Sequence, residues 1–545
     1  MIPSEHAVFG TAGMTRRALL TRSLAFGTGG LWLAACSGVV RQQPGGPQAQ
    51  PTTNAVARAT AGPRRGGTLH VSQPDDISPA VAPFVLAPVN TQLYNLVYDT
   101  LVRYDAQLNP QPRLATSWEW SPDFLQLTLK LRPGVKFHTG RPFTSADARF
   151  NLERLSDPAV NSQWLNYAKV MHVETPDPGT LLVRYDAPVR SSFDALSAAF
   201  MADPQTLDQT RDGRGFVGTG PFRFKEWMPN DHVTVVRDPD YWQPGKPYVD
   251  EVQVKIAPDA QSALINLESS GLDWMSGVPA PDARRLQNDA AYQLVLNGTG
   301  GSLYYLGLDV GIPALADKRV RQAFAYALDR QRIVETALLG FARPASIPWP
   351  RQSSAYDAAL DRTYSFDLTK ARGLRAAAGW DPNTTVGLSL SSAYPPTQPM
   401  AEILQQDLAS IGIKVAIQKL EAPEFTSRLQ KGALGGAWLA NMSFMHLSPA
   451  TFFISAFPVR LPNSSHFESP RYKELIDQSY AETDDQKLKP RLREMTQIML
   501  DEAFVVPIAE PSSGASGPQV TRAGVKNVTW DDWGWFIYED IWLER

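Results

Sequence analysis

The chain has 545 residues with 43% hydrophobic and 10% aromatic content, values that are typical of a globular protein. Its formal net charge is -3, so it lacks the basic balance of a nucleic-acid-binding protein, and we expect no nucleic-acid partner. The single cysteine, Cys36, excludes a disulfide framework within the chain.

The first 35 residues have the layout of an export signal. Arg16 and Arg17 precede an uncharged and mostly apolar stretch, residues 23–35, which ends in small side chains. A helix over this stretch would rise only about 20 Å, which is too short for a hydrocarbon core of ~30 Å. We therefore predict a cleaved signal over 1–35 rather than a spanning helix.

Cys36 follows this stretch in the sequence Leu33-Ala34-Ala35-Cys36, which resembles the lipobox of bacterial lipoproteins. The resemblance implies that Cys36 is lipidated and anchors the mature chain to a membrane. The residues around Arg16 and Arg17 also resemble a twin-arginine export signal, although paired arginines occur in ordinary Sec signals too. A cysteine without such a role is the alternative, and the export route stays open.

Residues 36–66 are rich in Pro, Gly, Gln and Thr and nearly free of large apolar side chains, so they cannot bury enough surface to fold. We predict a flexible tether with a reach of about 30 Å. The roughly 480 residues beyond it predict two or three domains at ~100–200 residues per domain.

Strand periodicity appears first in this body. Leucines at every second position, centred on Leu127 and Leu129, predict a half-buried strand over 125–132. Runs rich in β-branched residues predict further strands over 180–186, 232–238 and 251–257.

Helices alternate with these strands, which predicts an α/β fold. One begins at a capping box formed by Thr144 and Asp147. The longest covers 317–340, with Gly340 as its stop, and another covers 400–411 before Gly412. Their apolar stripes are expected to be core: Ala148, Leu152 and Leu155; Val320, Phe324, Ala327, Leu328, Val334 and Leu338; Met400, Leu404, Leu408 and Ile411.

Sequence motifs give no support for an enzyme. The seven histidines are too widely spaced for a local metal motif, and neither a nucleophile elbow nor a phosphate loop is present. The glycine-rich stretch 218–222 lacks the third glycine of a dinucleotide site and suits a tight turn. We predict no catalytic residue, no cofactor and no metal, with a site assembled through space as the open alternative.

Residues 112–158 resemble the signature region of the family 5 extracellular solute-binding proteins, the oligopeptide-, dipeptide- and nickel-binding group of ABC importers. Further blocks follow in the family's order, among them "YYLGLDV" and "YSFDLTKARGLRAAAGW", and the resemblance extends from about 66 to 545. It implies a two-lobed α/β periplasmic-binding-protein fold of the large type, with an extra subdomain in the first lobe and a ligand cleft between lobes. The lobes would comprise 67–300 and 301–507, and the chain would return to lobe I over 508–545.

The resemblance also implies ligand contacts. Peptide-binding members line the cleft with a Trp-x-Ala-Asp segment whose aspartate pairs with the ligand's ammonium group, and the corresponding residues here are Trp438, Leu439, Ala440 and Asn441. Asparagine carries no charge, so a desolvated ammonium would lose its main partner. This departure favours a ligand with a neutral polar end, or one whose cation finds another carboxylate.

Two more ligand contacts are implied, at Trp164 and Asp76. The alternatives are that Trp438 packs the second lobe, that Trp164 is a surface loop residue, that Asn441 caps a turn and that Asp76 only shapes its loop. The C-terminal tryptophans at 530, 533, 535 and 542 are expected to be core of the first lobe.

Together these features predict a lipid-anchored protein at the periplasmic or extracytoplasmic face that delivers a peptide or similar organic solute to an ABC importer. Its permease and ATPase partners would be separate chains, and it would be monomeric. Two alternatives stay open: an envelope-anchored hydrolase of peptides or glycans with an unrecognised carboxylate pair, and a ligand-presenting sensor component.

Overall fold

The computed structural model describes residues 62–78, 83–85, 88–105, 108–160, 162, 164–189, 191–296, 298, 301–392, 394, 396–443, 447–513 and 517–544. The predicted signal, Cys36 and the predicted tether up to residue 61 lie outside the described residues. Those that are described belong to one compact unit, Ala61–Arg545. Among them no helix combines the length and the apolar character that a bilayer crossing requires.

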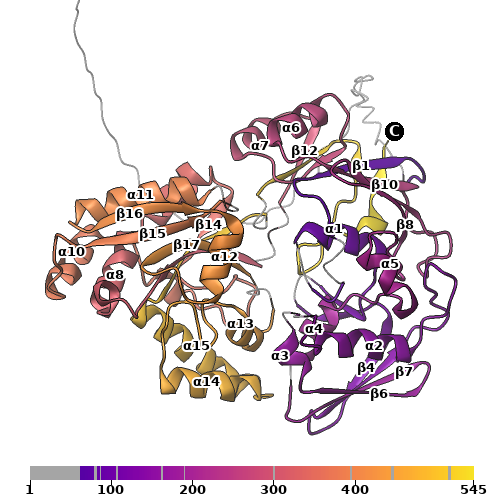
Figure 1. Cartoon of the computed structure of the whole chain (residues 1–545), viewed down its shortest axis with the longest axis horizontal. Helices are drawn as coiled ribbons and strands as arrows, with labels where there is room; N and C mark the ends of the chain where they lie inside the picture. The colour runs from indigo at the N-terminus through magenta and orange to yellow at the C-terminus, as the bar shows by residue number, and fades with distance from the viewer. Residues whose placement is uncertain are drawn as a thin grey trace, which may run out of the picture. The chain divides into compact units, whose positions relative to one another are not determined.

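A seven-stranded sheet joins segments from distant parts of the chain (Figure 1). In spatial order it contains β12 (Tyr292–Val295), β19 (Gln519–Arg522), β11 (Trp274–Met275), β1 (Thr68–Gln73), β10 (Glu251–Ile256), β9 (His232–Arg237) and β8 (Phe222–Met228). β1 pairs in parallel with β10 and β11, and the other pairs are antiparallel. The strands predicted over 232–238 and 251–257 are confirmed as β9 and β10.

A four-stranded antiparallel sheet has the order β4 (Ala115–Trp120), β5 (Gln126–Leu131), β7 (Thr180–Tyr185) and β6 (Met171–Asp177). β5 and β7 confirm the strands predicted over 125–132 and 180–186, and Leu127 and Leu129 are fully buried. A short pair, β2 (Val102–Tyr104) and β3 (Pro110–Pro112), precedes it.

A six-stranded sheet is built from the second half of the chain. Its order is β14 (Ala342–Pro344), β18 (Val505–Pro511), β13 (Ser302–Leu308), β17 (Ala437–Ser443), β15 (Thr385–Ser391) and β16 (Lys414–Leu420). β18 continues to Pro511, four residues past the predicted boundary at 507, and β19 of the seven-stranded sheet follows it in sequence.

Helices accompany each group of strands. Those in the first half are α1 (Pro88–Val97), α2 (Ser145–Leu155), α3 (Leu165–Ala168), α4 (Ser192–Ala198), α5 (Leu207–Arg211), α6 (Ala260–Glu268) and α7 (Ala280–Leu286). Those in the second half are α8 (Lys318–Ala327), α9 (Arg330–Arg332), α10 (Leu368–Ala377), α11 (Thr397–Ser410), α12 (Ala422–Gln430), α13 (Pro449–Ser455), α14 (Pro470–Tyr480) and α15 (Asp485–Glu502). The capping box at the start of α2 is confirmed, because Asp147 accepts a hydrogen bond of 2.8 Å from the backbone N–H of Thr144.

The single helix predicted over 317–340 is wrong. α8 ends at Ala327, Leu328 adopts an extended conformation, and Asp329 then caps α9 by accepting a 3.0 Å hydrogen bond from the N–H of Arg332. An aspartate competes with the helical backbone for hydrogen bonds, so it restarts the helix here. The predicted stripe is nonetheless buried throughout, from Val320 to Leu338.

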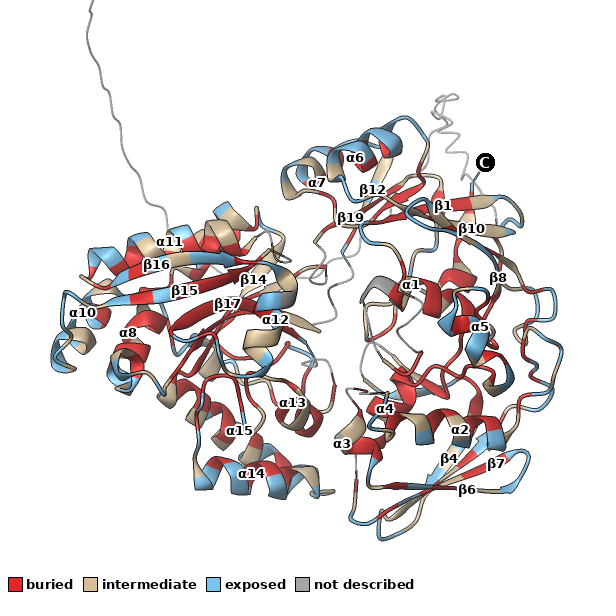
Figure 2. Ribbon diagram, in the orientation of Figure 1, coloured by how far each residue is buried: buried red, intermediate tan, exposed pale blue. Residues whose placement is uncertain are grey.

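Buried residues concentrate on the strands and on the helix faces that contact them (Figure 2). Gly218 and Gly220 permit their backbone to lie close to the end of α1, since a Cβ at either position would be within 2.5 Å of Val97 or Tyr98. The N–H of Gly220 donates a 2.9 Å hydrogen bond to the carbonyl of Val97. The glycine-rich stretch therefore packs against the end of α1.

Candidate functional site

Trp438 lies in the core of the six-stranded sheet and is fully buried. Its ring lies over Gly307 of β13, and its indole Nε1–H donates to the hydroxyl of Tyr305 at 3.3 Å. A ligand would reach this ring only after a movement that uncovers it. Its role as a ligand contact stays a prediction.

The neighbouring predicted contacts differ in exposure. Leu439 is buried, whereas Asn441 is half-buried and accepts a 2.9 Å hydrogen bond through Oδ1 from the hydroxyl of Ser302. The amide nitrogen of Asn441 is enclosed and finds no acceptor among the described residues. It is therefore available to donate to a carbonyl group, and the predicted ligand contacts at 439 and 441 stay untested.

Trp164 belongs to an aromatic cluster and is 2% exposed. Its ring contacts those of Tyr167 and Trp533 edge to face, with centroids 6.1 and 6.2 Å apart. Trp533 stacks on Trp535 at 5.1 Å, and Trp535 stacks on Phe200. Trp533 and Trp535, both half-buried, thus pack against the core around the four-stranded sheet, which agrees with the prediction for two of the four C-terminal tryptophans.

Asp76 lies elsewhere, just after β1, and holds its loop against the β8–β9 hairpin. One carboxylate oxygen accepts a 2.9 Å hydrogen bond from the indole N–H of Trp227, and the other accepts a 2.7 Å hydrogen bond from the N–H of Asn230. These contacts support the alternative in which Asp76 shapes the loop, and its ligand contact stays a prediction.

Three buried aspartates, which we call the acidic cluster, were not singled out by sequence reasoning: Asp194, Asp531 and Asp532. Asp194 is fully buried on α4. It accepts hydrogen bonds from the hydroxyl of Tyr104 at 2.7 Å, from the hydroxyl of Thr451 and from the N–H of Ser448 at 3.3 Å. Ser448 and Thr451 lie at the start of α13, so this carboxylate joins α13 to α4.

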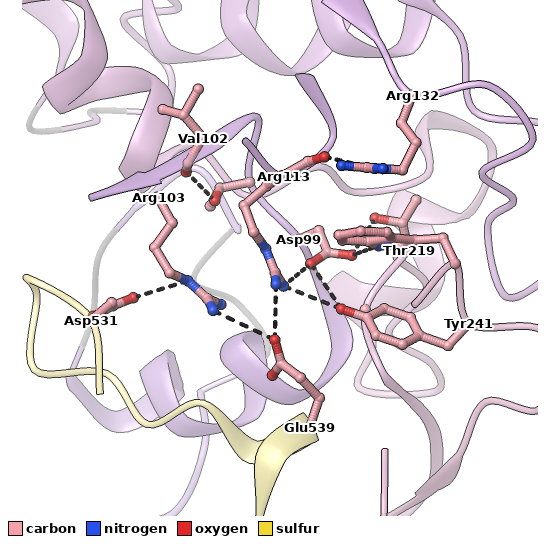
Figure 3. Close-up of polar contacts among 12 residues, drawn as sticks. Asp99, Val102, Arg103, Arg113, Arg132, Thr219, Tyr241, Asp531 and Glu539 are labelled. Carbon is pink, nitrogen blue, oxygen red and sulfur yellow. Dashed lines mark hydrogen bonds and ion pairs between the residues drawn. The ribbon is translucent and has the colours of Figure 1, made fainter. Parts of the chain in front are cut away.

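Asp531 is held by its own turn and by a cation. Its Oδ1 accepts hydrogen bonds from the N–H groups of Trp533 at 3.0 Å and Trp535 at 2.9 Å. Its Oδ2 lies 3.7 Å from Nε of Arg103, which also reaches Glu539 at 3.5 Å (Figure 3).

The same figure shows Arg113 between two buried carboxylates. It donates to Glu539 at 2.9 Å and to Asp99 on its other side. Asp99 also accepts a 2.8 Å hydrogen bond from the indole N–H of Trp242. Both guanidinium groups of this network are therefore committed to neighbouring carboxylates.

The balance between burial and nearby charges gives these carboxylates different pKa values. Burial raises the pKa of Glu539, but Arg113 and Arg103 outweigh it and hold that pKa at about 2. Burial raises the pKa of Asp194 and of Asp531 to about 6. Burial, followed by the charges of Asp531 and Asp194, raises the pKa of Asp532 well above its usual value. Asp532 is thus the carboxylate least compensated by its surroundings.

The hollows in the described part of the second half of the chain include one of about 210 Å³ and one of about 820 Å³. The smaller is lined by residues around Arg330 and Tyr364, and the larger by residues around Arg321 and Arg471. The described residues offer no group of three or more His, Cys, Asp or Glu side chains placed to hold a metal ion.

The family described as "Bacterial extracellular solute-binding proteins, family 5 Middle" matches residues 109–458, which is more than half of the chain. The chain belongs to this family. The predicted recognition is confirmed, and the chain is a solute-binding protein of the type that serves ABC importers.

Curated relatives agree with this assignment. A putative ABC transporter peptide-binding protein of Brucella ovis is 29% identical over 420 residues, which cover 73% of this chain and 78% of the relative. The glutathione-binding protein GsiB of Escherichia coli K12 is 28% identical over 426 residues, which cover 75% and 82%.

Solved structures share the fold. AgaA from A. tumefaciens R10, in complex with agropinic acid, is similar with a TM-score of 0.75 and 26% identity, covering 88% of this chain and 99% of that one. NikA from Brucella suis, in complex with Fe(III)-EDTA, has a TM-score of 0.79 at 23% identity and covers 88% and 100%. The predicted two-lobed α/β periplasmic-binding-protein fold is confirmed.

Sequence reasoning missed the acidic cluster, although two signals were present. Asp531 and Asp532 stand between Trp530 and Trp533, in a segment where aromatic side chains make burial probable on composition alone. Asp194 stands among small and apolar residues in "SSFDALSAAF". Neither signal indicates that these aspartates lie close together.

Proposed function

We propose that this chain is a lipid-anchored binding protein that delivers a peptide or a similarly sized organic solute to an ABC importer. The observation that carries the proposal is the family match over 109–458, supported by relatives named for binding peptides and glutathione and by a solved structure with agropinic acid. The permease and ATPase subunits are separate chains in this proposal, and the binding protein acts as a monomer outside the cytoplasm without altering its solute.

Solute capture would proceed by closure of two lobes, 67–300 with 508–545 and 301–507. The placement of β19 beside β11 and β12 supports the return of the C-terminal segment to the first lobe. A ligand that touches both lobes binds the closed form better, and that differential affinity drives closure. In this proposal Trp438, Leu439 and Asn441 of β17, with Trp164 and Asp76, contact the solute.

The solute can be identified directly. The full-length protein is purified and denatured. The small molecules that it releases are then identified by mass spectrometry. The identified solute is then added back to protein freed of it. A saturable thermal shift with the solute chemically unchanged is expected, and accumulation of a cleavage product would support the hydrolase alternative instead.

The anchor has a separate test. Cells that express the full-length chain are labelled with radioactive palmitate, alongside cells that express Cys36→Ser. We expect label in the wild-type band alone. An unlabelled wild-type band would contradict the proposed lipid anchor but would not affect the proposal of solute binding.

A further inference from the structure

Asp532 is 3% exposed, and neither of its carboxylate oxygens accepts a hydrogen bond from another described residue. The charges of Asp531 and Asp194 act on its carboxyl group, and its own charge acts on the hydroxyl of Tyr104. A buried carboxylate without a partner is costly, since it has lost its hydration and gained nothing in exchange.

The nearby cations do not offset this cost. Five buried carboxylates, those of Asp99, Asp194, Asp531, Asp532 and Glu539, share two guanidinium groups, those of Arg103 and Arg113. Even with Arg132, whose guanidinium lies 4.3 Å from the ring centroid of Trp242, carboxylates outnumber cations by five to three. Among the described residues, the carboxyl groups buried in this region therefore have too few guanidinium partners.

An aromatic cluster begins at the residue after Asp532. Trp533 follows Asp532 directly, and its indole N–H donates a 3.2 Å hydrogen bond to Ser197, three residues after Asp194 on α4. Trp533 also contacts the ring of Trp164, one of the predicted ligand contacts. Aromatic faces attract organic cations, so this aromatic cluster and the carboxylate favour the same ligand group.

We propose that Asp532 binds a positively charged ammonium or guanidinium group of the solute. This inference rests on the proposed function and specifies its ligand: an organic solute that carries a cation. It also supplies the carboxylate that Asn441 does not provide. The ligand cation would satisfy both oxygens of Asp532 and add a positive charge beside the buried carboxyl groups.

The test uses the full-length protein in detergent, freed of copurified solute by unfolding and refolding. The first probe is a mixture of di- to penta-alanine, compared with the same mixture after N-acetylation, which removes its only cation. The second probe is methylammonium chloride, compared with tetramethylammonium chloride, which has no N–H donor. Thermal shifts and titration calorimetry are recorded for the wild type, for Asp532→Asn and for Glu119→Gln, whose carboxylate is exposed on β4.

We expect free alanine peptides to bind the wild type at least tenfold more tightly than acetylated ones, because only the free ammonium group can donate charge-assisted hydrogen bonds to Asp532. Asp532→Asn should abolish this preference and the response to methylammonium, and Glu119→Gln should retain both. Equal binding of free and acetylated peptides would overturn the cation site but leave the proposed function standing. Methylammonium binding that depends on Asp532, without peptide binding, would support the site and remove peptides as solutes. No response to either probe would overturn the site.

Discussion

Gly307 of β13 and Trp438 of β17 are partners in an antiparallel register, and the indole ring lies so close that a Cβ at 307 would be 2.1 Å from its Cε2. We predict that Gly307→Ala lowers the free energy of unfolding by about 1–3 kcal/mol, because the added methyl group displaces the buried ring. Thermal or denaturant unfolding measures the loss. Gly387→Ala on β15 is the matched control, since that position is exposed and uncrowded. Equal losses for the two variants would contradict the prediction.

The hydrogen bond between Thr451 and Asp194 should matter most when the carboxylate is ionised. Removal of this donor by Thr451→Val should raise the pKa of Asp194 further above about 6 and destabilise the protein by about 1.5–3 kcal/mol at pH 8. The loss should be smaller at pH 5, where Asp194 is protonated. Unfolding at both pH values checks this, with Thr385→Val, at an exposed position of β15, as the control. A loss that does not depend on pH would contradict it.

Asp532 should make the solute-free protein less stable as pH rises. An aspartate whose pKa is raised in the folded protein binds its proton more tightly there than in the unfolded chain. Its contribution to stability is therefore complete at low pH and is lost as the pH rises from the ordinary pKa of 3.8 through the raised pKa of the folded protein. Asp531, Asp194, Tyr104 and Arg103 are the charged or titratable groups around it.

Asp532→Asn removes the loss of stability that accompanies ionisation of this buried carboxyl group. We expect the variant to be more stable than the wild type by about 1–3 kcal/mol at pH 8, with a smaller difference at pH 5. Unfolding curves from pH 5 to pH 8 measure the trend, and Glu119→Gln should show none. A variant that loses stability steadily as pH rises, relative to the wild type, would contradict the assignment of a raised pKa.

Asn441 offers a prediction about specificity. Asn441→Asp adds a carboxylate on β17 at the position where peptide-binding relatives are expected to hold the ligand's ammonium group. Affinity for free alanine peptides should rise about tenfold, and affinity for their acetylated forms should not. Titration calorimetry compares Asn441→Asp with Ser443→Asp, which adds the same charge at an exposed position of the same strand. An equal gain for both variants would point to general electrostatic attraction.

Much of the secondary structure could be predicted from the sequence, whereas the tertiary contacts could not. Alternating leucines specified β5 because one face of that strand must be buried, and the pair Thr144 and Asp147 marked the start of α2. The break at Leu328 was missed because the apolar stripe continues on both sides of it, while Asp329 acts through a local hydrogen bond.

The acidic cluster could not be predicted for a different reason. Asp194 precedes Thr451 by 257 residues and Asp532 by more than 300, and only the packing of α4, α13 and the C-terminal segment brings them together. The family resemblance directed attention to β17 instead, where it implies that Asn441 occupies the position of the aspartate in peptide-binding members. A buried charge without a partner becomes visible only when every neighbouring donor is known.

The position of β19 has a consequence for biosynthesis. β11 and β12 each pair with β19, which the ribosome adds more than 200 residues after β12. At ~5–20 residues per second, the two earlier strands wait on the order of ten seconds or more with open backbone edges. The exposed strand edges of such a nascent chain are binding sites for chaperones. A premature stop codon before Gln519 would leave the seven-stranded sheet without β19.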